Sequence, residues 1–87
     1  MIDREPVPSP ILYTQTGCVD SRRVHDWLAQ WGVTVIERNV TGDLAAVEAL
    51  ALTGTFATPL LVIGDRTVLG FRPALLANAL GLPDDVI

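Results

Sequence analysis

Lysine is absent from this sequence of 87 residues, and cysteine and histidine occur once each. A single cysteine excludes a disulfide within the chain, and one cysteine with one histidine cannot supply the four ligands of a structural zinc site. Six arginines stand against ten aspartates and glutamates, which gives a net charge of −4. We therefore expect no basic surface for nucleic acid or anionic lipid.

Long hydrophobic runs are also missing. No apolar run exceeds four residues, whereas a membrane-spanning helix needs about 20. Residues 1–10 hold acids and prolines where a signal peptide has an apolar stretch, so we expect a short flexible lead and a cytoplasmic protein. Apolar residues make up 49% of the chain and charged residues 18%, which is the composition of a folded protein. Residues 11–87 are therefore expected to form one domain.

The pattern of apolar residues and of glycine breaks predicts elements in the order βαβαββα. Strands are expected at residues 11–14, 33–40, 60–63 and 67–69, and helices at 19–31, 44–52 and 73–80. Residues expected to point into the core are Val24, Trp27, Leu28 and Trp31 in the first helix, Val33, Val35 and Ile36 in the second strand, and Leu75, Leu76, Ala79 and Leu80 in the last helix.

The connections between these elements define the expected fold class. A strand, helix and strand in succession imply two parallel strands joined by a right-handed crossover. The short turn at residues 64–66 implies an antiparallel hairpin. The sum is an α/β fold with a four-stranded mixed sheet and helices on both faces, which resembles the minimal thioredoxin fold.

Cys18 lies between the first predicted strand and the first predicted helix. The unpaired N–H groups and the dipole of a helix start favour an anion there, and the thiolate is the reactive form of cysteine. Arg22, one turn further on, is expected to lower the pKa of the thiol, while the carboxylate of Asp20 opposes this effect. The alternative is a buried cysteine that acts as a small hydrophobic side chain.

Three further positions are candidates for a role in the chemistry of Cys18. The hydroxyl of Ser21 could hydrogen-bond to the Cys18 sulfur, or it could only satisfy backbone donors of the first turn. The Thr58-Pro59 bond is expected to be trans from base rates, whereas a cis bond would expose the Thr58 backbone beside Cys18. His25 lies about 10 Å from Cys18 along the helix axis, so we expect no role for it as a general base.

Three segments in order resemble glutaredoxin-like proteins, and in particular the NrdH-type redoxins. They are residues 13–21 around Cys18, residues 57–62 with Thr58-Pro59, and the Gly-Phe-Arg-Pro sequence at 70–73. The resemblance covers about residues 11–82. It implies a thioredoxin-like (glutaredoxin) fold, a cis bond at Thr58-Pro59 and Cys18 as the nucleophile of thiol–disulfide exchange. It also implies that Gly70 and Phe71 belong to the surface that meets substrate.

The chain departs from the family pattern around its cysteine. Dithiol members carry Cys-x-x-Cys, and here Ser21 stands at the second position, so no disulfide can close within the motif. Glutathione-using glutaredoxins carry a lysine shortly before the cysteine, where this chain has Gln15. Monothiol glutaredoxins that bridge iron–sulfur clusters carry Cys-Gly-Phe-Ser, which shares only its ends with Cys-Val-Asp-Ser.

The sequence and the resemblance together predict a monothiol glutaredoxin-like oxidoreductase. We expect a monomer without a metal or stably bound cofactor, which acts on protein or small-molecule mixed disulfides and uses a small thiol, glutathione or an equivalent, as co-substrate. The expected site residues are Cys18 and Ser21 as catalytic groups and Gln15, Thr16, Arg22, Thr58, Pro59, Gly70 and Phe71 around the substrate. Two alternatives stay open: a thiol-bridged dimer that carries an iron–sulfur cluster or metal, and a redox-silent protein-binding module.

Overall fold

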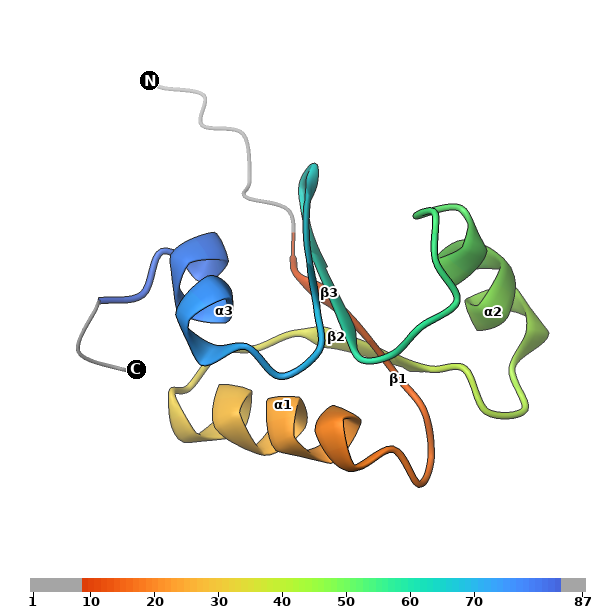
Figure 1. The fold of residues 1–87 in the computed structure, drawn as a ribbon, viewed down its shortest axis with the longest axis horizontal. Coiled ribbons are helices and arrows are strands. Elements are labelled where there is room, and N and C mark those ends of the chain that lie inside the picture. The colour runs from red at the N-terminus through yellow and green to blue at the C-terminus, as the bar shows by residue number, and fades with distance from the viewer. Residues whose placement is uncertain (1–8, 84–87) are drawn as a thin grey trace, which may run out of the picture.

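The computed structural model describes residues 9–83, and the predicted order βαβαββα is confirmed (Figure 1). The elements are β1 (Ile11–Thr14), α1 (Val19–Gln30), β2 (Ile36–Asn39), α2 (Leu44–Ala51), β3 (Leu60–Ile63), β4 (Arg66–Leu69) and α3 (Pro73–Leu80). Most of the predicted N-terminal lead lies outside the described residues. Among residues 9–83, no helix combines the length and the apolar character that crossing a membrane requires.

The four strands form one mixed sheet in the order β2-β1-β3-β4. β1 runs parallel to β2 and antiparallel to β3, and β3 pairs with β4 as an antiparallel hairpin. The parallel pair is the one joined through α1, as the crossover rule requires. This topology confirms the predicted mixed sheet and brings the C-terminal end of β1 to the start of α1.

Helices cover both faces of the sheet, as predicted (Figure 1). Leu12 and Leu61 belong to a cluster with buried residues of α1 and α3. Their neighbours Tyr13 and Leu60 belong to a second cluster with Leu50 of α2. Because successive side chains of a strand point to opposite faces, one strand pair supplies both clusters.

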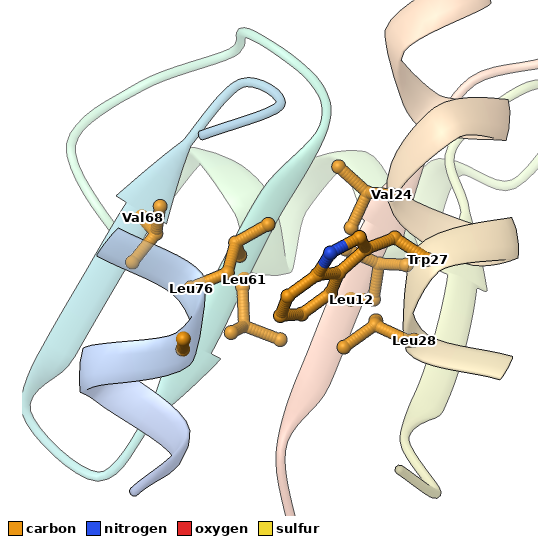
Figure 2. Close-up of a cluster of buried hydrophobic side chains, with 8 residues drawn as sticks. Leu12, Val24, Trp27, Leu28, Leu61, Val68 and Leu76 are labelled. Carbon is orange, nitrogen blue, oxygen red and sulfur yellow. The ribbon is translucent and has the colours of Figure 1, made fainter. Parts of the chain in front are cut away.

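The larger cluster fixes α1 on the sheet. Figure 2 shows Val24, Trp27 and Leu28 pointing from α1 toward the sheet, while Val68 and Leu76 approach from β4 and α3. All five side chains are buried. Since this packing fixes the helix, it also fixes the position of the helix start, where Cys18 lies.

Three residues predicted to be buried are exposed, and the element ends explain why. Ile36 is 52% exposed because it is the first residue of β2, which is an edge strand of the sheet. Trp31 is 40% exposed because α1 ends at Gln30, so the indole follows the helix as its C-cap. Leu75 is 51% exposed, and α3 buries Leu76 and Ala77 instead. The predicted second strand was also too long, since its first residues precede the ladder.

Candidate functional site

Cys18 is the N-cap residue of α1, at the end of the loop that follows β1. Its backbone is extended, with φ −83° and ψ 116°, and its carbonyl oxygen accepts the N–H of Arg22 at 3.2 Å. Gly17 precedes it with φ +84°, a left-handed conformation that favours glycine. Cys18 is only partly buried, so the alternative of a thiol sealed in the core is wrong.

Ser21 links the loop before Cys18 to the sulfur itself. Its N–H donates to Cys18 Sγ at 3.4 Å, and its hydroxyl oxygen accepts the N–H of Gln15 at 3.2 Å. Hydrogen bonds from the Ser21 side chain and then from its backbone are the main causes that lower the pKa of the Cys18 thiol. Burial raises this pKa, while the Thr58 side chain and the Asp20 backbone lower it further. Hydrogen bonds to the charged form thus favour a thiolate at Cys18.

The charged side chains of the first helical turns pair with one another. Arg22 Nε lies 3.6 Å from Asp26 Oδ2, and Arg23 Nη1 lies 3.6 Å from Asp20 Oδ1. These side chains are largely exposed, and such pairs contribute little energy. The predicted effect of the helix-start N–H groups is confirmed, since the backbones of Ser21 and Asp20 both lower the thiol pKa, whereas the side chains of Arg22 and Asp20 are not among its causes.

The loop before β3 meets the loop that carries Cys18. The peptide bond between Thr58 and Pro59 is cis. The thiol of Cys18 donates to the carbonyl oxygen of Thr58 over 3.9 Å, across 40 residues of sequence. The Thr58 hydroxyl donates to the side-chain oxygen of Gln15 at 3.3 Å. The structure therefore brings Gln15, Cys18 and Thr58 together, as the predicted site requires.

Gly70 and Phe71 lie toward the β4 side of this loop. The N–H of Gly70 donates to the carbonyl oxygen of Pro59 at 2.9 Å. Phe71 is partly buried against the larger core cluster. Both residues line a shallow hollow with Asp20, Arg72 and Leu75. The segment implied to meet substrate thus adjoins both the start of α1 and the Thr58-Pro59 loop.

A second hollow, which we call the β2 groove, opens beside Cys18 between α1 and β2. Its volume is about 390 Å³. It is lined by residues 14–18, by Ser21, Arg22, His25 and Asp26 of α1, and by Glu37 and Asn39 of β2. Sequence reasoning did not include Glu37 or Asn39 in the site. Their alternate spacing on one strand face was the available signal, but nothing in the sequence showed that this face adjoins Cys18.

Asn39, at the end of β2, and Thr41 form hydrogen bonds with Thr16 in the loop before Cys18. Asn39 Nδ2 donates to the hydroxyl oxygen of Thr16 at 3.0 Å. The N–H of Thr16 donates to Thr41 Oγ1 at 3.0 Å, and the N–H of Thr41 donates to Asn39 Oδ1 at 2.8 Å. Thr16 is therefore tied to the sheet on the side away from Thr58.

The donor groups around the site do not form a metal centre. Within residues 9–83, no three His, Cys, Asp or Glu side chains lie close enough to hold a metal ion. The ring nitrogens of His25 face carboxylates instead, with Nδ1 3.3 Å from Asp26 and Nε2 3.7 Å from Glu37. The arrangement around Cys18 supports thiolate chemistry on a partly exposed sulfur.

Ser21→Ala is expected to raise the pKa of the Cys18 thiol, because it removes the largest of the causes that lower it. The thiolate is the species that reacts, so the profile of alkylation rate against pH should move to higher pH. At neutral pH we expect several-fold slower alkylation by iodoacetamide. Arg22→Ala is the control on the same helix, and it should move the profile less because Arg22 pairs with Asp26. Equal shifts for both variants would contradict this assignment.

Comparison with known proteins gives a consistent set of matches. Residues 11–68 match the family model for glutaredoxin. The solved thioredoxin-like protein BC3987 is 30% identical, with 80% of this chain and 97% of that chain covered and a TM-score of 0.75. The NrdH-redoxin from Escherichia coli is 27% identical, with 82% and 93% covered and a TM-score of 0.73. A glutaredoxin, grx-1, from Archaeoglobus fulgidus shares the fold at 20% identity, with 83% and 85% covered and a TM-score of 0.76. A search of the curated proteins found no match.

Proposed function

The chain belongs to the glutaredoxin family, and we propose that it is a monothiol thiol–disulfide oxidoreductase with Cys18 as its nucleophile. The observation that carries the proposal is the environment of the sulfur. Cys18 caps α1, is only partly buried, and has a thiol pKa lowered by hydrogen bonds from Ser21. A thiolate that is both stabilised and accessible is what attack on a disulfide needs.

In the first half-reaction, the Cys18 thiolate attacks the small-thiol sulfur of a mixed disulfide between a protein and a small thiol. A new S–S bond forms at Cys18 Sγ, the old S–S bond breaks, and the protein thiolate leaves and takes a proton from water. Before the attack, the N–H groups of Ser21 and Asp20 and the Ser21 hydroxyl hold the negative charge on the sulfur.

The second half-reaction needs a thiol from solution. Cys18 is the only cysteine, and the hydroxyl of Ser21 cannot form a disulfide. A second small thiol, as its thiolate, attacks the sulfur bound to Cys18 and releases the Cys18 thiolate. The small thiol is thereby oxidised to its disulfide while the protein substrate has been reduced. Glutathione or an equivalent thiol in the reducing cytoplasm is the co-substrate that we propose.

The substrate surface in this proposal extends from the sulfur toward β4. An extended substrate would meet the backbone of Thr58, whose carbonyl oxygen faces Cys18 Sγ at 3.9 Å. It would continue along Gly70 and Phe71, since Gly70 is hydrogen-bonded to Pro59. On the opposite side, Gln15 and Thr16 border the sulfur from the loop after β1. We place the small thiol on this side, so the small thiol and the protein chain approach the Cys18 sulfur from different directions.

The test is capture of the first half-reaction with 2-hydroxyethyl disulfide, which carries no charge. The reduced protein should gain the mass of one mercaptoethanol unit, peptide mapping should place it on Cys18, and excess small thiol should remove it. A reference peptide with an ordinary cysteine is the control, and it should react more slowly at neutral pH. A Cys18 thiol that forms no adduct while the peptide reacts would overturn the proposal.

A further inference from the structure

The β2 groove carries more carboxylates than free cationic groups. Asp26 and Glu37 contribute carboxylates, and the guanidinium of Arg22 lies 3.6 Å from Asp26. His25 stands between the two acids, with its ring nitrogens 3.3 Å from Asp26 and 3.7 Å from Glu37. Two carboxylates thus stand against one guanidinium in the wall of the groove, and a Cys18 thiolate adds a further negative charge.

Glu37 is held in a defined position from inside the domain. Thr14 is 2% exposed, lines the groove, and donates its hydroxyl to Glu37 Oε2 at 2.8 Å. Both residues belong to paired strands, Thr14 to β1 and Glu37 to β2. The carboxylate of Glu37 is therefore anchored by a buried hydroxyl, while its side chain remains 39% exposed to a ligand in the groove. Its other oxygen, Oε1, lies on the side of His25.

An anionic ligand would find no ammonium group and no unpaired guanidinium in this groove. Gln15 is neutral, and its side-chain oxygen accepts the hydroxyl of Thr58. The one guanidinium that lines the groove already faces Asp26. A ligand with a positive charge would instead meet the carboxylate of Glu37, and Cys18 lines the same hollow. A volume of about 390 Å³ suits a small molecule.

Resting on the proposed function, we infer that the β2 groove selects small disulfides of aminothiols, with the ammonium group against Glu37. The Cys18 thiolate attacks one sulfur of such a disulfide, the S–S bond breaks, and a bond between Cys18 Sγ and the aminothiol sulfur forms. The other aminothiolate leaves and takes a proton from water. Oxidation of Cys18 balances the reduction of the disulfide, so no further reactant is involved in this step.

The experiment compares three disulfides of different charge in a single turnover. Cystamine is cationic, 2-hydroxyethyl disulfide is neutral, and 3,3′-dithiodipropionate is anionic. Each rate constant for Cys18 is divided by that of the same disulfide with 2-mercaptoethanol, because leaving-group pKa alone changes the rate. At low ionic strength we expect the corrected rate with cystamine to exceed that with the anionic disulfide about tenfold. Added salt should shrink the difference.

Glu37→Gln tests the groove itself, and Glu48→Gln is its matched control. Glu48 lies exposed on α2, on the other face of the sheet, so both variants lose the same charge. We expect Glu37→Gln to lower the ratio of cystamine to 2-hydroxyethyl disulfide about threefold, and Glu48→Gln to leave it unchanged. Because this ratio compares substrates on one variant, a general loss of folded protein cancels.

The outcomes separate this inference from the proposed function. Reaction with 2-hydroxyethyl disulfide but no preference for cystamine would overturn the inference and leave the monothiol function standing. Equal losses in the two variants would also overturn it, because net charge and not the groove would then set the preference. Failure of Cys18 to react with all three disulfides would overturn both.

Discussion

Cys18→Ser should reduce turnover of a mixed disulfide by about a thousandfold or more, which is the scale for loss of a nucleophile. Cys18 is the only thiol of the chain, and a serine hydroxyl is not ionised at neutral pH. Serine is a favourable N-cap residue, so α1 should still begin at the same place. The measurement is reduction of 2-hydroxyethyl disulfide with a small thiol present, together with a thermal unfolding curve to confirm that the variant folds.

This variant also tests the redox-silent alternative. A protein-binding module would show no turnover in the native chain either, and its partner would bind the native chain and Cys18→Ser equally well. A variant that retains more than about a tenth of native turnover, with its fold intact, would contradict Cys18 as the nucleophile.

Ser21→Cys should convert the chain from a monothiol to a dithiol reductant. The Ser21 N–H lies 3.4 Å from Cys18 Sγ, and positions three residues apart on a helix are neighbours. A disulfide between positions 18 and 21 is therefore within reach. The variant could release a mixed disulfide from Cys18 by internal attack, and the native chain could not.

The measurement is a single turnover of the reduced protein with a protein disulfide such as insulin, without any small thiol. Ser21→Cys should reduce close to one disulfide per molecule, oxidising its own two thiols in exchange. The native chain should stop at a mixed disulfide on Cys18. Ser21→Ala is the matched control, because it loses the same hydroxyl and gains no thiol. Reduction of a substrate disulfide to two free thiols by the native chain alone would contradict the monothiol mechanism.

Periodicity predicted the fold well because the buried faces repeat regularly. Val24, Trp27 and Leu28 follow the spacing of one helix face, and all three are buried. Trp31 continues the same spacing but lies beyond the end of the helix. Ile36 has the character of a core residue, and only its place on an edge strand leaves it exposed. Sequence pattern indicates which residues are apolar, whereas the packing of other elements decides which are covered.

Within the site, contacts between residues close in sequence could be predicted, and contacts between residues far apart in sequence could not. Cys18 and Ser21 could be paired from their spacing alone, since one helical turn joins them. The contact between Thr58 and Gln15 spans 43 residues, and the contact between Thr14 and Glu37 spans 23. Both contacts depend on the order and the pairing register of the strands, and the sequence alone does not determine that register. The family resemblance pointed to Thr58, whereas nothing in the sequence showed that the strand face of Glu37 adjoins Cys18.

The domain has two separate core clusters, one on each face of the sheet, and this allows one face to be engineered independently of the other. The cluster under α1 and α3 supports the start of α1, whereas Leu50 of α2 packs with Tyr13 and Leu60 on the opposite face. Substitutions at Leu28 and Leu50 should combine additively in their effects on stability, because the two side chains belong to different clusters with the sheet between them. The exposed Leu44, at the start of α2, and Leu52, its C-cap residue, are then suitable places to attach a reporter dye or a fusion partner away from Cys18.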